Sequence, residues 1–396
     1  MLAPTRAPSA RRPAPQRPRA SRGPVNRTPR RRWRRIAVAV AVLCLLPGLF
    51  SYARMLTQPS DSSFSIRSVE WLRDNGARGL VNRVESIYYS LTAPATGGPG
   101  LHALPKLPGA VAARAAARAR AARTYRPPRI RAVIRPALPG EGVWHATFTG
   151  GGSRPPVLIT SFRPDPNYPQ LVAGVAWIDH TRTSVWLYPG RLEPAVAMNS
   201  RGPMEIPMSL RSKLVASFNS GFKLADSGGG FAVGGHAYAP LKNGLATLVR
   251  YRNGQMNVIS WTGGPSVSSN IIYARQNLPL IASGGKPNPN LSDGPEWGAT
   301  LGNAIQVWRS GVGIDRHGNL IYAAANDQTV GSLAAILIRA GAVRAMEMDI
   351  NTYWTSFITY RHPGAGGAAN LLASMDRSSQ RYLTPEDRDF FGVYLR

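Results

Sequence analysis

The chain has 396 residues and a formal net charge of +28, and most of this charge lies in two segments. Residues 1–35 and 101–140 together contain 21 basic residues and no acidic residue. Because the rest of the chain is only mildly basic, the composition argues against a nucleic-acid-binding fold, which would carry clustered charge on the folded domain. The length allows two or three domains, but the unusual first 140 residues favour one globular domain.

An apolar run follows the arginine-rich N-terminus. Residues 1–35 are rich in Arg and Pro and are expected to be a disordered cytoplasmic tail, because they carry too little apolar surface to fold. Residues 36–56 contain about 18 successive uncharged residues, the lower limit for crossing a bilayer. The preceding arginines predict a single-pass signal anchor in the cell membrane, with the C-terminal domain extracytoplasmic. Cleavage near the small residues Ser51 and Ala53 is the alternative.

The only cysteine, Cys44, lies inside this apolar run. The predicted exported part therefore has no thiol, which excludes disulfides and cysteine-based metal sites there. We expect neither a metal nor another cofactor, and we expect stability to come from a packed core.

Residues 57–140 are predicted to form juxtamembrane helices and a basic linker. Apolar residues between positions 65 and 91 recur at helical spacing with a break at Asn75-Gly76, which indicates a helical hairpin. Residues 109–123 are rich in Ala and Arg and have high helix propensity, but they lack a stripe of large apolar residues. This segment is expected to be a solvated spacer helix. The alternative is electrostatic contact with anionic cell-wall polymer or lipid head groups.

Residues 141–396 show the pattern of short strands separated by Gly, Pro, Asn and Asp turns. A hairpin is expected within residues 245–261, and the clearest helix runs from Ser332 to Ala340, with Gly341 as its C-cap. Further strands are predicted at residues 143–150, 156–164, 171–179 and 183–190. The predicted fold class is therefore α+β, a strand-dominated mixed domain with few helices.

The segment from Arg309 to Asp349 has the most regular pattern, which predicts a strand, a hairpin turn, a second strand, a helix and a third strand. An arginine suited to phosphate opens the segment, and a carboxylate suited to proton or sugar chemistry closes it. Both lie at predicted strand ends, where sites are usually built. This arrangement suggests chemistry on an anionic sugar compound.

Two carboxylates near the end of the third strand are the candidate catalytic residues. Side chains alternate along a strand, so Glu347, Asp349 and Asn351 are expected on one face. The other face is expected to carry Met346, Met348 and Ile350. Two close carboxylates push one pKa upward, which allows one to act as an acid while the other stays ionised. The alternative is that these acids pair with neighbouring arginines, such as Arg309 or Arg344.

A second candidate segment is the turn after the strand-like residues 214–217. Gly221 permits a tight turn, and Asn219 and Lys223 are suited to a sugar hydroxyl or a phosphate. The alternative is a capped turn with an outward-facing lysine.

Three segments, in this order, carry a resemblance: FNSGFK at residues 218–223, WRSGVGID at 308–315, and TVGSLAAILIRAGAVRAMEMD at 329–349. Together they resemble the phosphodiester glycosidase domain family, over about residues 144–360. The resemblance implies a pocket surrounded by a turn, a strand and a strand end. By position, the site residues that it implies are Asn219, Gly221, Arg309, Gly313 and Asp349.

The chain departs from the family pattern at several of these positions. Ser220 replaces a glycine, and Lys223 replaces a phenylalanine. Glu347 stands where the family has an asparagine, and Ile350 and Asn351 replace two glycines after the aspartate. The loss of these glycines removes backbone that approaches a ligand closely, so the resemblance supports the fold more than the activity.

Three functions remain open from the sequence. The first is a membrane-anchored extracytoplasmic glycosidase for a sugar-1-phosphate diester or related glycosidic bond of envelope glycan, with Asp349 and Glu347 as catalytic residues. Its substrate-binding residues would be Asn219, Gly221, Lys223, Arg309, Gly313 and Asn351. The second is a non-catalytic binding module for anionic cell-wall glycan, and the third is a membrane-tethered scaffold. The expected partners are membrane lipid and an envelope glycan or sugar phosphodiester, with no nucleic acid.

Overall fold

The computed structural model describes residues 28–111, 125–148, 155–292, 297, 306–362 and 364–396. The chain divides into two compact units between Thr57 and Gln58. The predicted spacer helix lies almost entirely outside the described residues, and so does the predicted disordered tail up to residue 27.

Helix α1, Thr28–Thr57, is the described part of the first unit. Within the described residues it is the one helix long and apolar enough to cross a membrane, over Arg31–Thr57. At about 1.5 Å per residue, this stretch exceeds the ~30 Å hydrocarbon core of a bilayer. The helix is compatible with a single-pass anchor or with a signal sequence. The side of the membrane on which the second unit lies stays a prediction.

The two predicted helices and the break at Asn75-Gly76 between them are present in the structure. Helix α2, Phe64–Leu72, and helix α3, Arg78–Thr92, are joined by the π-type turn η1, Arg73–Ala77. Gly76 has a φ of 92°, a conformation that glycine adopts without steric cost. In these two helices, all of whose residues are described, only Val81 is buried.

Polar contacts hold the hairpin and the segment before it to the rest of the second unit. Lys223 forms an ion pair with Glu70 of α2, and Arg78 of α3 lies 2.6 Å from Asp226. Upstream of the hairpin, Asp61 forms an ion pair with Arg377. Because the hairpin is attached mainly through ion pairs and buries little apolar surface, it should unfold locally more readily than the core.

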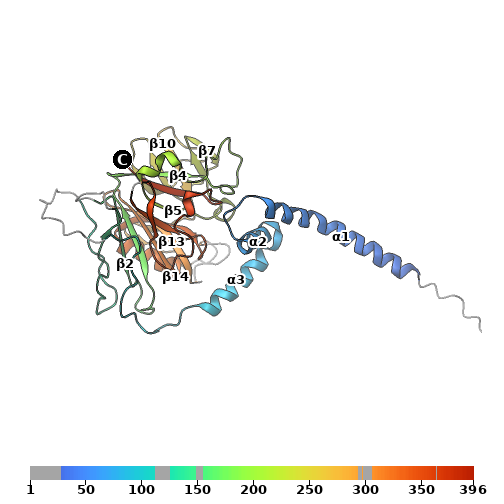
Figure 1. The fold of residues 1–396 in the computed structure, drawn as a ribbon, viewed down its shortest axis with the longest axis horizontal. Helices are drawn as coiled ribbons and strands as arrows, with labels where there is room; N and C mark the ends of the chain where they lie inside the picture. Colours follow the sequence, from blue (N-terminus) through green and yellow to red (C-terminus); the bar gives the residue numbers. More distant parts are fainter. Residues whose placement is uncertain (1–27, 112–124, 149–154, 293–296, 298–305, 363) are drawn as a thin grey trace, which may run out of the picture. The chain divides into compact units, whose positions relative to one another are not determined.

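Strands dominate the rest of the second unit, as the sequence predicts, and all recorded strand pairs are antiparallel (Figure 1). The eight-stranded sheet has the order β1 (His145–Ala146), β2 (Val157–Phe162), β3 (Ala173–Ile178), β14 (Leu320–Gln328), β13 (Val307–Asp315), β15 (Ala342–Ile350), β11 (Leu280–Ser283), β12 (Lys286–Pro287). One five-stranded sheet has the order β7 (His236–Ala239), β6 (Phe231–Val233), β10 (Ile271–Gln276), β8 (Ala246–Tyr251), β9 (Met256–Ser260). The other has the order β17 (Gly366–Asn370), β16 (Phe357–His362), β5 (Leu214–Asn219), β18 (Phe390–Leu395), β4 (Thr183–Tyr188).

Short helical segments connect these strands. The longest, α5, spans Val330–Arg339 and begins at the N-cap Thr329, whose hydroxyl accepts a hydrogen bond from the Ser332 amide at 3.1 Å. Gly341 follows it with a φ of 106°, as expected for a C-terminal glycine. In the described part of this unit, further short helices are η2 (Met208–Lys213), α4 (Leu224–Ser227) and η4 (Arg381–Leu383).

The eight-stranded sheet is buried on both faces because alternate residues of its strands enter two cores. Ile159 and Tyr322 belong to the core shared with the two smaller sheets. Leu158, Ile321 and Ala345 belong to the core under helix α5. This explains why its strands read as nearly continuous apolar runs in the sequence.

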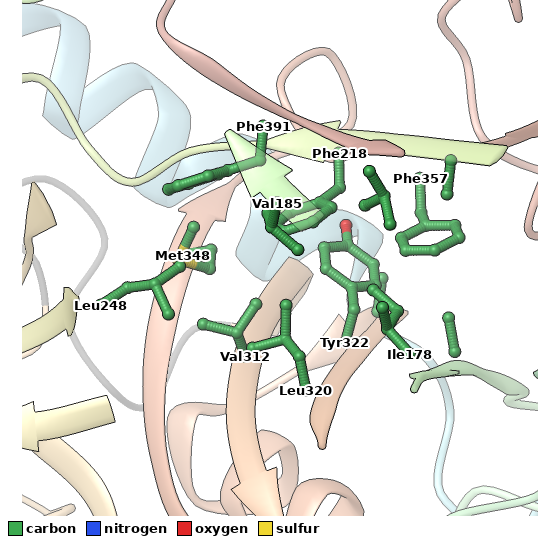
Figure 2. Packing of buried hydrophobic residues seen from close by; sticks show 14 of the residues in the cluster. Ile178, Val185, Phe218, Leu248, Val312, Leu320, Tyr322, Met348, Phe357 and Phe391 are labelled. Atoms are coloured by element: carbon green, nitrogen blue, oxygen red, sulfur yellow. The ribbon is translucent and has the colours of Figure 1, made fainter. Parts of the chain in front are cut away.

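An aromatic cluster joins strands β5, β14, β16 and β18 in the first of these cores (Figure 2). The ring centroid of Tyr322 lies 5.5 Å from that of Phe218 and 4.9 Å from that of Phe357. Phe391 stacks on Phe218, with the two ring centroids 5.0 Å apart. Close packing of these rings fixes the end of β5, and with it the turn at residues 219–223.

Candidate functional site

Strand β15 contains a β-bulge close to its C-terminal end. Arg309 pairs with Ile350, whereas Gly311 pairs with Glu347, so β15 has one residue more than β13 over this stretch. As a result, Ile350 packs in the core under α5 and does not share the face of Met346 and Met348, which corrects the strict alternation expected from the sequence. Bulges are enriched beside functional sites, where they redirect a side chain. Here the irregular stretch lies between Glu347 and Ile350, and it contains Asp349.

The two candidate carboxylates have different arginine partners. Glu347 lies 2.6 Å from Arg309, and neither side chain is exposed to solvent. Arg309 also donates a hydrogen bond from Nε to the Gln328 carbonyl at 2.8 Å. Burial raises the pKa of Glu347, and the neighbouring Arg309 opposes this effect. Arg309 and Glu347 are therefore paired with each other inside the sheet. This is the alternative stated above, in which the acids pair with neighbouring arginines.

Asp349 is held at the bulge by two hydrogen bonds to its carboxylate. Arg388 donates from Nη2 at 2.8 Å, and the Ile350 amide donates at 3.0 Å. Burial raises the pKa of Asp349 to about 7, and the effect of burial exceeds the opposing effect of Arg388. The negative charge of Glu70 adds to the rise. A carboxyl with this pKa exchanges protons near neutral pH, as a catalytic acid or base must.

Arg388 is a central residue of the site that the sequence analysis missed. Its guanidinium lies 4.8 Å from the ring centroid of Trp354, and it donates a hydrogen bond to the Gly221 carbonyl at 3.3 Å. It therefore connects the turn at residues 219–223 to Asp349. The one sequence signal is the run of four charged residues at 386–389, directly before the buried strand β18.

Most residues of the turn at 219–223 are buried and make their contacts inside the protein. Asn219 is buried, and its amide donates to Ser310 Oγ at 3.0 Å and accepts from the Tyr322 hydroxyl at 2.8 Å. At Gly221, an added Cβ would lie 3.1 Å from the Asn277 side chain. Lys223 is partly exposed and pairs with Glu70 and, at 3.4 Å, with Asp74. Of the predicted residues in this turn, Lys223 is the one at the surface of the site.

The two remaining predicted residues, Gly313 and Asn351, lie at different places in the structure. Gly313 lies in strand β13, where the neighbouring strand β15 packs closely against it. A Cβ at this position would stand only 2.6 Å from the Cβ of Ala342. Asn351 follows the bulge with a φ of 78°, a conformation that asparagine tolerates better than most residues. Its side chain accepts a hydrogen bond from the Tyr353 amide at 2.7 Å. Asn351 thus adopts a backbone conformation that is more typical of glycine.

Several buried polar atoms around this turn have no hydrogen-bond partner in the described part of the chain. They are Ser220 Oγ, Asn277 Oδ1, Glu347 Oε2 and Arg388 Nε. Ser220 accepts a hydrogen bond from the Asp349 amide through its carbonyl, and Asn277 donates to the Glu347 carbonyl. Buried polar atoms are almost always paired, so these exceptions are candidate positions for a bound water, ion or ligand group.

A cavity of about 370 Å³, within the usual volume range for a ligand site, lies between the helical hairpin and the residues that follow β15. Residues of α2, η1 and α3 form one wall, including Glu70 and Arg73. Residues 351–354, which follow the bulge, form the other wall together with Asp376. The cavity and the surroundings of Asp349 share two residues, Glu70 and Trp354.

The described ranges contain no group of three His, Cys, Asp or Glu side chains arranged to hold a metal ion.

No protein-family model matches the sequence, and no curated protein matches it. Among solved structures, the catalytic domain of zebrafish N-acetylglucosamine-1-phosphodiester α-N-acetylglucosaminidase, auto-inhibited by its pro-peptide, is similar at 14% identity and a TM-score of 0.40, over 63% of this chain and 86% of that one. A hypothetical protein from Synechocystis is similar at 12% identity and a TM-score of 0.36, over 61% and 63%. A putative exported protein from Burkholderia pseudomallei is similar at 10% identity and a TM-score of 0.34, over 59% and 75%. The chain is similar to these three structures only distantly, and only in fold.

Proposed function

We propose that this protein is a membrane-anchored extracytoplasmic glycosidase that cleaves a sugar-1-phosphate diester or related glycosidic bond of envelope glycan. The observation that carries the proposal is the state of Asp349. It is a buried carboxyl at a strand bulge, its pKa is raised to about 7, and its orientation is fixed by Arg388. Buried carboxyls with such pKa values are typical general acids and bases.

In the proposed reaction Asp349 is the proton donor. The bond between the anomeric carbon and the leaving oxygen breaks, Asp349 transfers its proton to that oxygen, and water adds to the anomeric carbon. The proton that this water loses passes to solvent, and Asp349 regains a proton from solvent. Because burial raises the pKa of Asp349 to about 7, the protonated donor form is available near neutral pH. Glu347 and Arg309 support the strand end through their buried ion pair.

Cationic side chains beside Asp349 favour an anionic substrate. Lys223 is paired with the carboxylates of Glu70 and Asp74, and the charge of Arg388 acts on both Asp349 and Glu70. A phosphate or other anionic group would take the place of a carboxylate at Lys223.

A non-catalytic binding module for anionic glycan is the second candidate. The observation that favours it is that both oxygens of Asp349 already have a donor, namely Arg388 and the Ile350 amide. A carboxylate bound in this way also stabilises the end of a strand without taking part in chemistry. A membrane-tethered scaffold is the third candidate, supported by the N-terminal apolar helix alone.

Hydrolysis assays with the detergent-purified full chain test the proposal. The substrates are a panel of aryl glycosides and methyl diesters of sugar-1-phosphates, and the enzymes are the wild type, Asp349→Asn and the surface control Glu205→Gln. We expect Asp349→Asn to lower turnover by about 10²- to 10⁴-fold while the control keeps wild-type activity. Absence of wild-type turnover on the whole panel, with measurable binding of the same compounds, would leave the binding module.

A further inference from the structure

The cavity between the helical hairpin and residues 351–354 has the chemical character of a saccharide site. We propose that it is a subsite for the part of a glycan chain next to the bond that Asp349 cleaves. This inference rests on the proposed function, because it extends the same site to a longer substrate. The juxtamembrane hairpin would then be a part of the binding site as well as a connection to the membrane.

Aromatic side chains form the apolar part of the cavity. Tyr88 and Tyr89 come from α3, and Tyr353 and Trp354 come from the loop after β15. A sugar ring has C–H faces that pack on aromatic rings and a rim of hydroxyls that needs polar partners. Tyrosine and tryptophan offer both a flat apolar surface and a polar group, so they suit such a ligand.

Polar side chains line the same cavity. Arg73 lies 3.0 Å from Glu70 and forms an ion pair with Glu85, and all three residues contribute to the wall. Arg73 Nε has no hydrogen-bond partner in the described residues. Donors and carboxylate oxygens at fixed positions beside aromatic rings can recognise the hydroxyls around a sugar ring.

Two residues of the cavity wall also contact the surroundings of Asp349. Trp354 lines the cavity and packs against Arg388, which holds Asp349 at 2.8 Å. Glu70 lines the cavity and pairs with Lys223. A glycan bound in the cavity would therefore reach toward the proton donor.

A lipid chain is the competing occupant, because a predicted membrane helix precedes the hairpin. The charged groups of Glu70, Arg73 and Glu85 argue against it, since a hydrocarbon chain would remove them from water without offering hydrogen bonds. A polyhydroxylated ligand offers those hydrogen bonds. We therefore assign the cavity to a saccharide.

Tyr88 allows a sharp test because its side chain lines the cavity and is still 60% exposed. Its replacement by alanine should therefore cost little stability. Ile87 is the matched control, because it is adjacent on the same helix and 55% exposed but does not line the cavity. Binding is measured by calorimetry on the full chain with chitotetraose, mannotetraose, tetragalacturonate and the corresponding monosaccharides, and with dioctanoyl phosphatidylglycerol.

We expect at least one tetrasaccharide to bind, and Tyr88→Ala to weaken its binding about tenfold or more while Ile87→Ala leaves it unchanged. The monosaccharides should bind at least tenfold more weakly than that tetrasaccharide. Equal affinities in the two variants, or lipid binding that depends on Tyr88 without tetrasaccharide binding, would overturn the inference. These measurements need no turnover, so their result is separate from the hydrolysis assays that test the proposed function.

Discussion

Glu70 of helix α2 forms an ion pair with Lys223, in the turn that follows strand β5. The same carboxylate raises the pKa of Asp349 and experiences the charge of Arg388. A residue of the juxtamembrane hairpin thus belongs to the electrostatic environment of the candidate catalytic carboxyl. Changes in the hairpin should therefore alter the chemistry of the site.

The pH dependence of turnover should report the pKa of Asp349. Burial raises this pKa to about 7, and a proton donor is active only in its protonated form. We expect kcat/KM to fall as the pH rises through about 7, and the residual activity of Asp349→Asn to lack this falling limb. A pH–rate profile between pH 4 and 9 measures it. A wild-type rate that is constant from pH 6 to 8 would argue against Asp349 as the donor.

The same carboxyl should make folding stability depend on pH. Its pKa is higher in the folded protein, about 7, than in the unfolded chain, about 3.8, so the folded state binds more protons between these values. Stability from this group is present at low pH and is lost as the pH rises through about 7. Relative to Asp349→Asn, the wild type should lose at most about 4 kcal/mol between pH 4 and 8, at about 1.4 kcal/mol per unit. Chemical denaturation at both pH values measures the difference. Asp61, whose pKa is also raised to about 7, contributes equally to both proteins and cancels.

Glu347→Gln should affect folding more than turnover. The substitution leaves the fully buried guanidinium of Arg309 without its counter-charge. Removal of one partner of a buried ion pair typically costs about 3–5 kcal/mol. We expect a loss of stability of this size, while kcat per folded molecule changes less than threefold. A much lower kcat with unchanged stability would instead assign Glu347 to the chemistry.

Glu70→Gln should strengthen the binding of anionic substrates. The change removes a carboxylate that competes with the substrate for Lys223, while the side chain keeps its shape. We expect KM for a sugar phosphodiester to fall about fivefold, equivalent to ~1 kcal/mol, with KM for a neutral aryl glycoside unchanged. Asp226→Asn, which breaks the ion pair of the hairpin with Arg78, is the control for a general loosening of the hairpin. An equal effect of both variants would contradict direct competition.

The topology can be tested on intact cells. The arginine cluster precedes helix α1, so the second unit should lie outside the cytoplasm. External protease should then remove the C-terminal domain in cells that express the full chain. Protection of that domain, with digestion of the N-terminal tail, would reverse the predicted orientation.

The parts of the fold that depend on local sequence were predictable. The hairpin of β13 and β14, helix α5 and strand β15 follow from apolar patterns, the cap Thr329 and the terminal Gly341. The break at Gly76 between α2 and α3 is likewise a local property of glycine.

The composition of the site was not predictable, because it depends on contacts between distant segments. Asp349 accepts a hydrogen bond from Arg388, and the charge of Glu70 raises its pKa. No periodic pattern in the sequence connects these three positions. The bulge in β15 also escaped prediction, since an extra residue in one strand leaves no distinct mark in the sequence. Arg309 was expected at the substrate, but its pairing with Glu347 depends on strand register, which only the tertiary structure fixes.

The contact of Trp354 with Arg388 gives the protein an internal optical reporter. Indole fluorescence responds to a charge near the ring, and the Arg388 guanidinium lies 4.8 Å from the ring centroid of Trp354. A ligand that draws Arg388 away from the indole, or that excludes water from it, will change the emission of this residue. The difference between the spectra of the wild type and Trp354→Phe isolates its signal from those of the other eight tryptophans among the nine in the chain. Occupancy of the site can thus be followed in real time without a label and before any substrate has been identified.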